Sequence, residues 1–167
     1  AFENLTDEKP RLGDLMLQTK IRTLDTNTSA ALNSRSFALL GDPALRLAYP
    51  ENRIQITSMP DTIGALGKVK VEGIVTDYSG NQLTDFNGLL YPSVYDKAAN
   101  TQSLDNDGSG PFTYSEWRNL VFKGKSSVTN GAFSFEFVVP KDINRIFDVG
   151  RINLYADNST VDAPLFA

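Results

Sequence analysis

The hexapeptide DNDGSG, which begins at Asp105, carries the residue types best suited to chemistry in this sequence, as ligands for a hard cation. Oxygen ligands at alternate positions can wrap calcium, and Asp105, Asp107 and Ser109 hold positions one, three and five of such a loop. Glu116 falls at position twelve, where a calcium loop places its bidentate carboxylate, and Gly110 falls at the sixth position, where that loop turns sharply. The spacing therefore predicts calcium ligands at Asp105, Asp107, Ser109 and Glu116.

The same segment also fits a plain surface turn. DNDGSG has the composition of a solvated, flexible turn. Tyr114 and Trp117 lie on either side of Glu116 and favour entry into a β-strand, whereas an EF-hand loop leads into a helix. Bound calcium and a solvated loop both stay open, and no other cofactor is expected.

Two residue types are missing altogether. The chain of 167 residues has no cysteine and no histidine. It therefore lacks a thiol nucleophile, an imidazole base, a disulfide and any thiolate or imidazole metal ligand. A serine–lysine pair at Lys125 and Ser126 is disfavoured, because neighbouring residues of an alternating segment point to opposite faces. We expect no catalytic residue in this chain.

Charge and chain ends restrict the class of protein. The 16 Lys and Arg against 20 Asp and Glu give a net charge of −4, which disfavours a nucleic acid partner. No apolar run approaches the roughly 18 residues of a transmembrane helix. The start, AFENLTDEKP, has neither an initiator Met nor the features of a signal peptide. We expect a piece of a longer protein, trimmed at both ends.

The first 49 residues have helical spacing followed by an apolar run. In Arg11–Leu24, apolar side chains recur at three and four residues, which predicts a helix. Ser36–Leu40, SFALL, ends at the breakers that begin with Gly41 and suits a buried strand, with a helix fragment as the alternative. This part is therefore expected to be a short α/β segment with one helix and one strand.

From Pro50 onward the apolar period is two. Strands are predicted at Arg53–Thr57, Lys68–Tyr78, Leu89–Asp96, Asn119–Lys125, Ala132–Val139 and Gly150–Ala156. Short alternating strands separated by turns are typical of an antiparallel β-sandwich, here over residues 50–157. The predicted core comprises Val69, Val71, Val75, Phe133, Phe135, Phe137, Ile152 and Leu154. Pro92 predicts an edge strand or a bulge, and residues 158–167 are expected to be a linker or a disordered tail.

Four aromatic residues allow two interpretations. Tyr91, Tyr95, Tyr114 and Trp117 could form a sugar-binding platform on an exposed sheet face, or they could fill the core of the sandwich and its rim. The sequence leaves both open.

Two stretches resemble a known family. LLGDPALRL, at Leu39–Leu47, resembles the sequence that closes the catalytic domain of gingipain-like cysteine peptidases. Val121–Asn144, VFKGKSSVTNGAFSFEFVVPKDIN, is similar to the stretch that follows this domain in type IX secretion sortases of the family, and the spacing in Gly73–Lys97 matches as well. The resemblance covers about residues 10–157. In the family the catalytic His and Cys lie upstream of GDPALRL, so no position here inherits a catalytic role.

The resemblance implies an organisation and a function. Residues 1–49 would be the tail of a caspase-like catalytic domain, and residues 50–157 an immunoglobulin-like sandwich. The chain would be a non-catalytic accessory segment of a surface peptidase that removes C-terminal signal domains from secreted proteins. Its partners would be its own catalytic domain, other secretion-system subunits and secreted substrates, at the outer-membrane surface of a Gram-negative bacterium or outside it. The alternative is a free-standing adhesion or carbohydrate-binding sandwich module.

Overall fold

A computed structural model describes residues 10–24, 36–47, 50–106, 108–144 and 146–166. The chain divides into two compact units, Ala1–Tyr49 and Pro50–Ala167. No helix within the described residues has the length and apolar character needed to cross a bilayer.

In the described part of the first unit, α1 (Leu12–Leu24) confirms the helix predicted there. A turn packs against its start. In that turn the carboxylate of Asp42 accepts a hydrogen bond of 2.8 Å from the backbone N–H of Ala44. This local bond fixes the reversal that brings the GDPAL segment back to the helix.

The turn caps the helix with its backbone. The N–H of Leu12 donates to the carbonyl of Leu45, and the N–H of Gly13 donates to the carbonyl of Pro43, both over 2.9 Å. The first N–H groups of a helix have no partner inside the helix, so these two carbonyls satisfy donors that would otherwise need water. The motif that resembles the peptidase family therefore has a structural task here.

The strand predicted at Ser36–Leu40 is wrong. Residues 37–40 belong to no helix or strand, and Phe37 and Leu40 are 67% and 96% exposed. Among the described residues of this unit, the single β-bridge joins Arg11 to Arg46. A strand needs a neighbouring ladder, and the described part of the unit offers this run none.

The ten strands found among the described residues all belong to the second unit. They are β1 (Arg53–Ser58), β2 (Lys68–Thr76), β3 (Gly88–Tyr95), β4 (Ala99–Gln102), β5 (Thr113–Glu116), β6 (Leu120–Lys123), β7 (Ser126–Thr129), β8 (Ala132–Val138), β9 (Arg151–Asp157) and β10 (Asp162–Phe166). The six predicted strands are all present, while β4, β5, β7 and β10 were not predicted.

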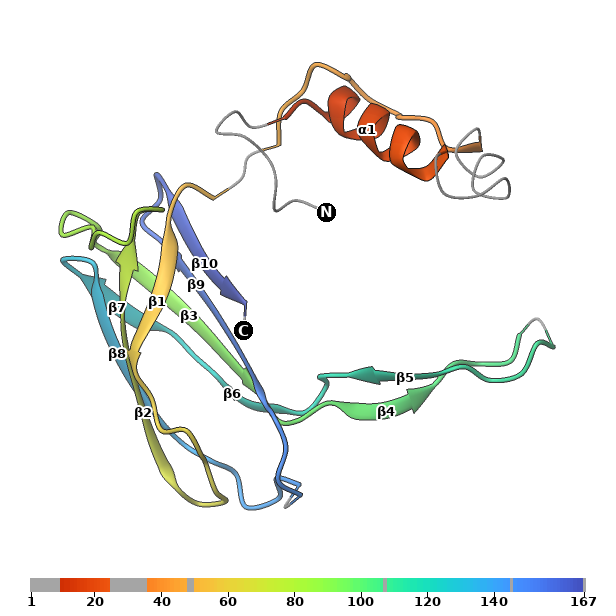
Figure 1. Ribbon diagram of the computed structural model, residues 1–167. Coiled ribbons are helices and arrows are strands. Elements are labelled where there is room, and N and C mark those ends of the chain that lie inside the picture. Colours follow the sequence, from red (N-terminus) through yellow and green to blue (C-terminus); the bar gives the residue numbers. More distant parts are fainter. Residues whose placement is uncertain (1–9, 25–35, 48–49, 107, 145, 167) are drawn as a thin grey trace. The chain divides into compact units, whose positions relative to one another are not determined.

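The strands form an antiparallel sandwich (Figure 1). One layer has the strand order β1-β2-β8. In the other layer β3 pairs with β9, β10 pairs with the far side of β9, and β6 pairs with the far side of β3. β7 joins the two layers, because it pairs with both β3 and β8. The sheet nearly closes on itself, since β1 contacts β10 and the side-chain amide of Asn52 donates to the carbonyl of Asp162 over 3.3 Å. This order corresponds to the two sheets of an immunoglobulin-like sandwich and confirms the predicted fold class.

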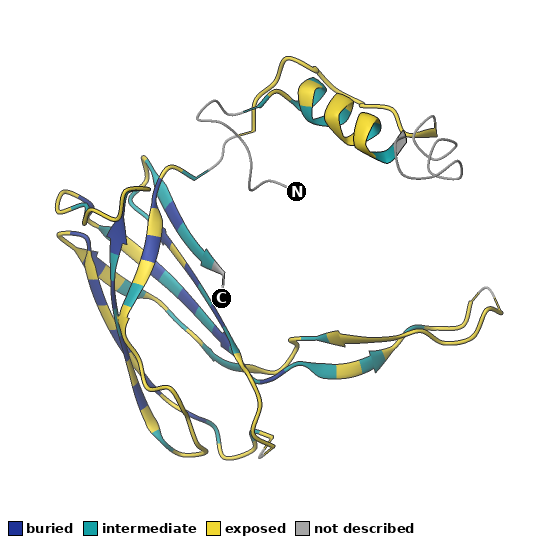
Figure 2. Cartoon of the chain, in the orientation of Figure 1, coloured by how far each residue is buried: buried dark blue, intermediate teal, exposed yellow. Residues whose placement is uncertain are grey.

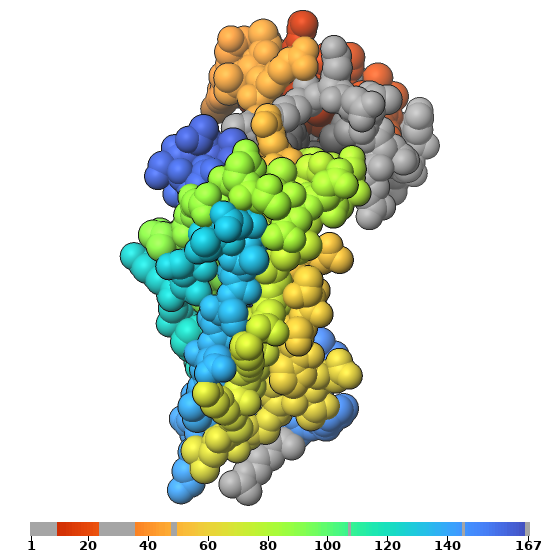
Figure 3. Space-filling model, turned by 90° about the vertical axis from the view of Figure 1, so that its left-hand side faces the viewer, coloured from red at the N-terminus to blue at the C-terminus, as the bar shows by residue number. Residues whose placement is uncertain are grey.

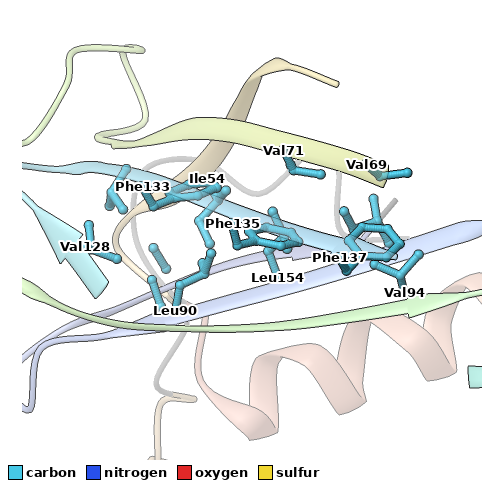
Figure 4. Close-up of a cluster of buried hydrophobic side chains, with 14 of the residues drawn as sticks. Ile54, Val69, Val71, Leu90, Val94, Val128, Phe133, Phe135, Phe137 and Leu154 are labelled. Carbon is cyan, nitrogen blue, oxygen red and sulfur yellow. The ribbon is translucent and has the colours of Figure 1, made fainter. Parts of the chain in front are cut away.

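The core lies between the two layers, and Figure 4 shows its side chains pointing toward one another. All eight predicted core residues are buried. Phe122 stacks on Phe137 with ring centroids 4.8 Å apart, which extends the core to β6. The alternation of Phe133, Phe135 and Phe137 with polar neighbours on β8 therefore sets the inward face, as its period predicts.

Pro92 lies in an inner strand, not at an edge. It is buried on β3, between β9 on one side and β6 with β7 on the other. The N–H of Gly124 donates to the Pro92 carbonyl over 3.1 Å, at the break between β6 and β7. The N–H and C=O of one strand residue point to the same side of the strand. The nitrogen of Pro92 therefore faces the break between β6 and β7, where its lack of an N–H removes no hydrogen bond between paired strands.

Residues 158–167 were expected to be a linker or tail, and this expectation is wrong for the described ones. The side-chain oxygen of Asn158 accepts hydrogen bonds from the N–H groups of Thr160 and Val161, which turns the chain back. β10 then pairs along β9, and Ala163 is fully buried. The segment completes the sandwich with the alternating side chains of Val161, Ala163 and Leu165, which pack on the core and which the sequence analysis did not use.

Candidate functional site

A buried ion pair stands at the end of β3. The Nζ atom of Lys97 lies 2.8 Å from Oδ1 of Asp96, and each side chain is only 10% exposed. The backbone N–H of Asp96 donates to the carbonyl of Asn119, which joins the end of β3 to the start of β6. The pair therefore sits at the point where the chain leaves the sandwich for a long insertion and returns to it.

The same pair holds a distant loop. The N–H of Asn144 donates to Oδ2 of Asp96 over 3.0 Å, and Lys97 Nζ donates to the carbonyl of Asn144 over 2.5 Å. Burial by itself raises the pKa of Asp96, but the hydrogen bonds from Lys97 and Asn144, with the charge of Lys97, outweigh it and bring this pKa below its ordinary value. The carboxylate is thus held ionised as an anchor for the loop between β8 and β9.

A cavity of about 1010 Å³ opens beside this anchor, between the two layers. Its inner wall consists of core side chains from both sheets: Val69, Val71, Val94, Val121, Phe137 and Ile152. The loops that follow β1 and β8 form its mouth, and they meet at the same end of the sandwich (Figures 1 and 3). The described mouth residues include Ile146, Phe147 and Val149, which are 69%, 87% and 78% exposed.

The predicted calcium loop lies in the insertion between β3 and β6. β4 and β5 pair with each other as a separate two-stranded sheet, and Figure 2 shows no buried residue on them. Asp105 and Ser109 are exposed in the loop that joins them, while Asp107 lies outside the described residues. Asp105 Oδ1 accepts a hydrogen bond of 2.8 Å from the N–H of Gly110, so it closes the turn.

Glu116 lies away from that loop. It is opposite Ala99 at the sandwich end of the hairpin, whereas the loop begins beyond Gln102. Its carboxylate accepts a 3.0 Å hydrogen bond from the hydroxyl of Thr101 and lies 3.7 Å from Arg118. Across the described residues no group of three Asp or Glu side chains gathers as a metal site. Calcium binding in this loop stays a prediction.

The four aromatic residues come from two places in the second unit. Tyr91 and Tyr95 are half-buried on the outer face of β3, and Tyr114 and Trp117 are partly exposed on or next to β5. The structure instead pairs Tyr91 with Tyr155 of β9, with ring centroids 6.3 Å apart. Sequence analysis missed Tyr155, although its alternation with buried Leu154 was a usable signal.

Comparison with known proteins gives two findings for the two units. Residues 1–48 match the sequence profile of peptidase family C25. The crystal structure of dimeric latent PorU from Porphyromonas gingivalis matches 99% of this chain, with 29% sequence identity and a TM-score of 0.64. The similarity to PorU therefore extends over both units of the chain. The predicted resemblance to gingipain-like proteins is thereby confirmed, and the chain spans 17% of the solved PorU chain.

A second solved structure is much less similar. The match to the sporulation control protein Spo0M from Bacillus subtilis covers 71% of this chain and 48% of the Spo0M chain, with 12% identity and a TM-score of 0.37. No curated protein matches the chain.

The anchor at Asp96 and Lys97 was not found from the sequence. An Asp-Lys pair followed by two alanines has no distinctive spacing, and its partner Asn144 lies 48 residues beyond Asp96. Only the fold brings these groups together.

Proposed function

We propose that this chain is a non-catalytic accessory segment of a gingipain-like surface cysteine peptidase. It contributes the end of the catalytic domain and the immunoglobulin-like domain that follows. The observation that carries this proposal is the PorU match, which extends over 99% of the chain and so includes both units, with the family C25 match on the first unit. The absence of Cys and His from the sequence supports a non-catalytic role.

The physical task of the segment is support. In the first unit the GDPAL turn caps α1, which fixes the chain as it leaves the catalytic domain. In the second unit a single core of side chains stabilises the sandwich as a body of its own. Such a body positions the peptidase toward its substrates, which are the C-terminal signal domains of secreted proteins, and toward other secretion-system subunits at the surface of a Gram-negative cell.

The experiment is a deletion in the parent protein. Residues 50–167 are removed, and the parent with its catalytic Cys replaced is the matched control. We expect the deletion to lower the unfolding temperature and the yield of folded parent, while the Cys variant keeps both and loses only the processing of secreted substrates. A deleted parent that folds and processes its substrates like the wild type would refute the supporting role.

A second candidate is a carbohydrate-binding module, favoured by the outer face of β3 and β9. The Tyr91–Tyr155 pair is flanked there by Lys125, whose Nζ lies 5.4 Å from the Tyr91 ring centre. Aromatic rings with polar neighbours suit sugar rings, which have both apolar and hydroxyl faces. Binding of the chain to a glycan array, lost in Tyr155→Ala, would favour this function over the accessory role.

A further inference from the structure

We infer that the cavity at the end of the sandwich is a binding site for a single long aliphatic chain, such as a fatty acid. The cavity lies at the end of the sandwich, its lining includes Val69, Val94 and Ile152 from the two layers, and its volume is about 1010 Å³. Ligand sites in proteins are usually about 300–1,000 Å³ and mostly apolar.

The polar groups of the cavity indicate an occupant without hydrogen-bonding groups in its buried part. Asp96 and Lys97 bond to each other and to the backbone of Asn144, so this deep polar cluster has its own partners. A ligand group that needs hydrogen bonds would lose water here and gain little in exchange. A hydrocarbon chain has no hydrogen bonds to water that it would lose on entering the cavity.

The charges around the mouth do not select a headgroup. Lys141 and Arg151 line the cavity together with Asp61 and Asp148, which gives two charges of each sign. Because these charges balance, the affinity is expected to come from the apolar walls and to depend little on the charge of the head.

The mouth extends the apolar surface outward. Phe147 is 87% exposed and Leu66 is 65% exposed, and both line the cavity. Exposed apolar groups of this size are costly unless something covers them. An aliphatic chain that fills the cavity and continues between the two loops would cover the inner walls and the mouth at the same time.

The test uses the whole chain with monomeric cis-parinaric acid, a fluorescent fatty acid. We expect saturable binding that decanoic acid displaces. Ala65→Trp and Val121→Trp place a bulky ring on the cavity lining and should weaken binding about tenfold or more. Val138→Trp is the matched control, since Val138 is 61% exposed on β8 and does not line the cavity. Circular dichroism checks that each variant folds.

Magnetic resonance on the unmodified chain makes the result independent of the variants. Contacts from the bound acyl chain to the methyl groups of Val69, Val94 and Ile152 are expected. The inference is overturned if the folded chain does not bind the probe, if Val138→Trp weakens binding as much as the cavity variants, or if the contacts fall elsewhere, such as on Leu104 of the hairpin. Binding to phosphatidylcholine vesicles without binding of the monomeric acid would overturn it too, since loop insertion into a surface would then explain the exposed mouth.

Discussion

The backbone N–H of Asn144 donates to the carboxylate of Asp96 across 48 positions of sequence, over a distance of 3.0 Å. This bond, with the one from Lys97 to the same Asn144, ties the loop after β8 to the end of β3. The loop forms one side of the cavity mouth. A buried charge pair thus adds a polar tie at this end of the sandwich, beside the backbone hydrogen bonds that join Leu66 and Gly67 to Val139.

Removal of the anchor is expected to destabilise the second unit. Asp96→Ala leaves the Lys97 ammonium buried without its counter-charge, and removing one partner of a buried pair costs about 3–5 kcal/mol. Asp61→Ala is the control, because Asp61 lines the same cavity but is exposed. Urea unfolding measures the free energy of unfolding of both variants. A loss for Asp96→Ala no larger than the loss for Asp61→Ala would show that the pair does not anchor the loop.

Acid should remove the stabilisation that the Asp96–Lys97 pair gives to the second unit. The pKa of Asp96 is lower in the folded chain than its ordinary value, so the folded state binds this proton less readily than the unfolded state. The stabilisation is therefore complete above the unfolded pKa of about 3.9 and is lost as the pH falls through the lower folded value. We expect the stability difference between wild type and Asp96→Asn to be constant from neutral pH to about 5 and to shrink below about 4. The midpoints of urea unfolding for both proteins, measured across this pH range, test the prediction. A stability difference that grows as the pH falls would contradict a lowered pKa of Asp96.

Gly13→Ala is expected to loosen the cap on α1. In an open helix this change stabilises by about 1 kcal/mol. Here an added Cβ would lie 2.9 Å from Cβ of Pro43 and 3.1 Å from its carbonyl oxygen, which is too close. Hydrogen exchange at the amides of Leu12 and Gly13 should therefore speed up, while Gln18→Ala, at an exposed position of the same helix, leaves it unchanged. Slower exchange in Gly13→Ala would mean that the turn adapts.

The sequence predicts those parts of the fold in which one face is apolar. Phe133, Phe135 and Phe137 alternate with Ser134 and Glu136, and this pattern specifies both the strand and its buried face. β4 and β5 read ANTQ and TYSE, with no apolar face, so their pairing depends on the hairpin that joins them. The run at residues 37–40 is apolar, but it forms no strand in the described part of the chain, because an apolar composition cannot supply a neighbouring strand.

The site was harder to predict than the fold, for a physical reason. The calcium prediction rested on spacing along the chain, but the hairpin places Glu116 opposite Ala99 and away from Asp105. The cavity depends on how two loops and two sheets separate at one end, and the anchor depends on Asn144. Such long-range meetings have no local signature.

Loss of a core ring should cost far more than loss of a surface side chain of the same strand. Phe135→Ala removes a buried ring that lies 5.8 Å from Phe122 between centroids, and such truncations cost about 3–5 kcal/mol. Val138→Ala, on the exposed face of β8, should change stability by about 0.5 kcal/mol or less. Thermal unfolding of both variants measures the difference. Equal unfolding temperatures for the two would mean that the inward face of β8 is misassigned.

The last prediction concerns the apolar surface of the first unit. Phe37, Leu40 and Leu45 are 67%, 96% and 55% exposed, and Leu17 and Ile21 of α1 are exposed as well. Apolar groups that gather on a surface tend to become covered, so we expect the full chain to self-associate. The buried core lies entirely between Ile54 and Ala163, so a shortened chain that starts at Pro50 should keep its unfolding temperature and stay monomeric.

Light scattering and thermal unfolding of the two chains test this. The double substitution of Phe37 and Leu40 by Ser in the full chain is the matched control, and it should weaken association without lowering the unfolding temperature of the sandwich, because neither residue belongs to its core. A full chain that stays monomeric at high concentration would refute the role of this surface. Association that persists in the shortened chain would assign it to the second unit, where the exposed aromatic side chains of the hairpin, Phe112 and Tyr114, are the next surface to substitute.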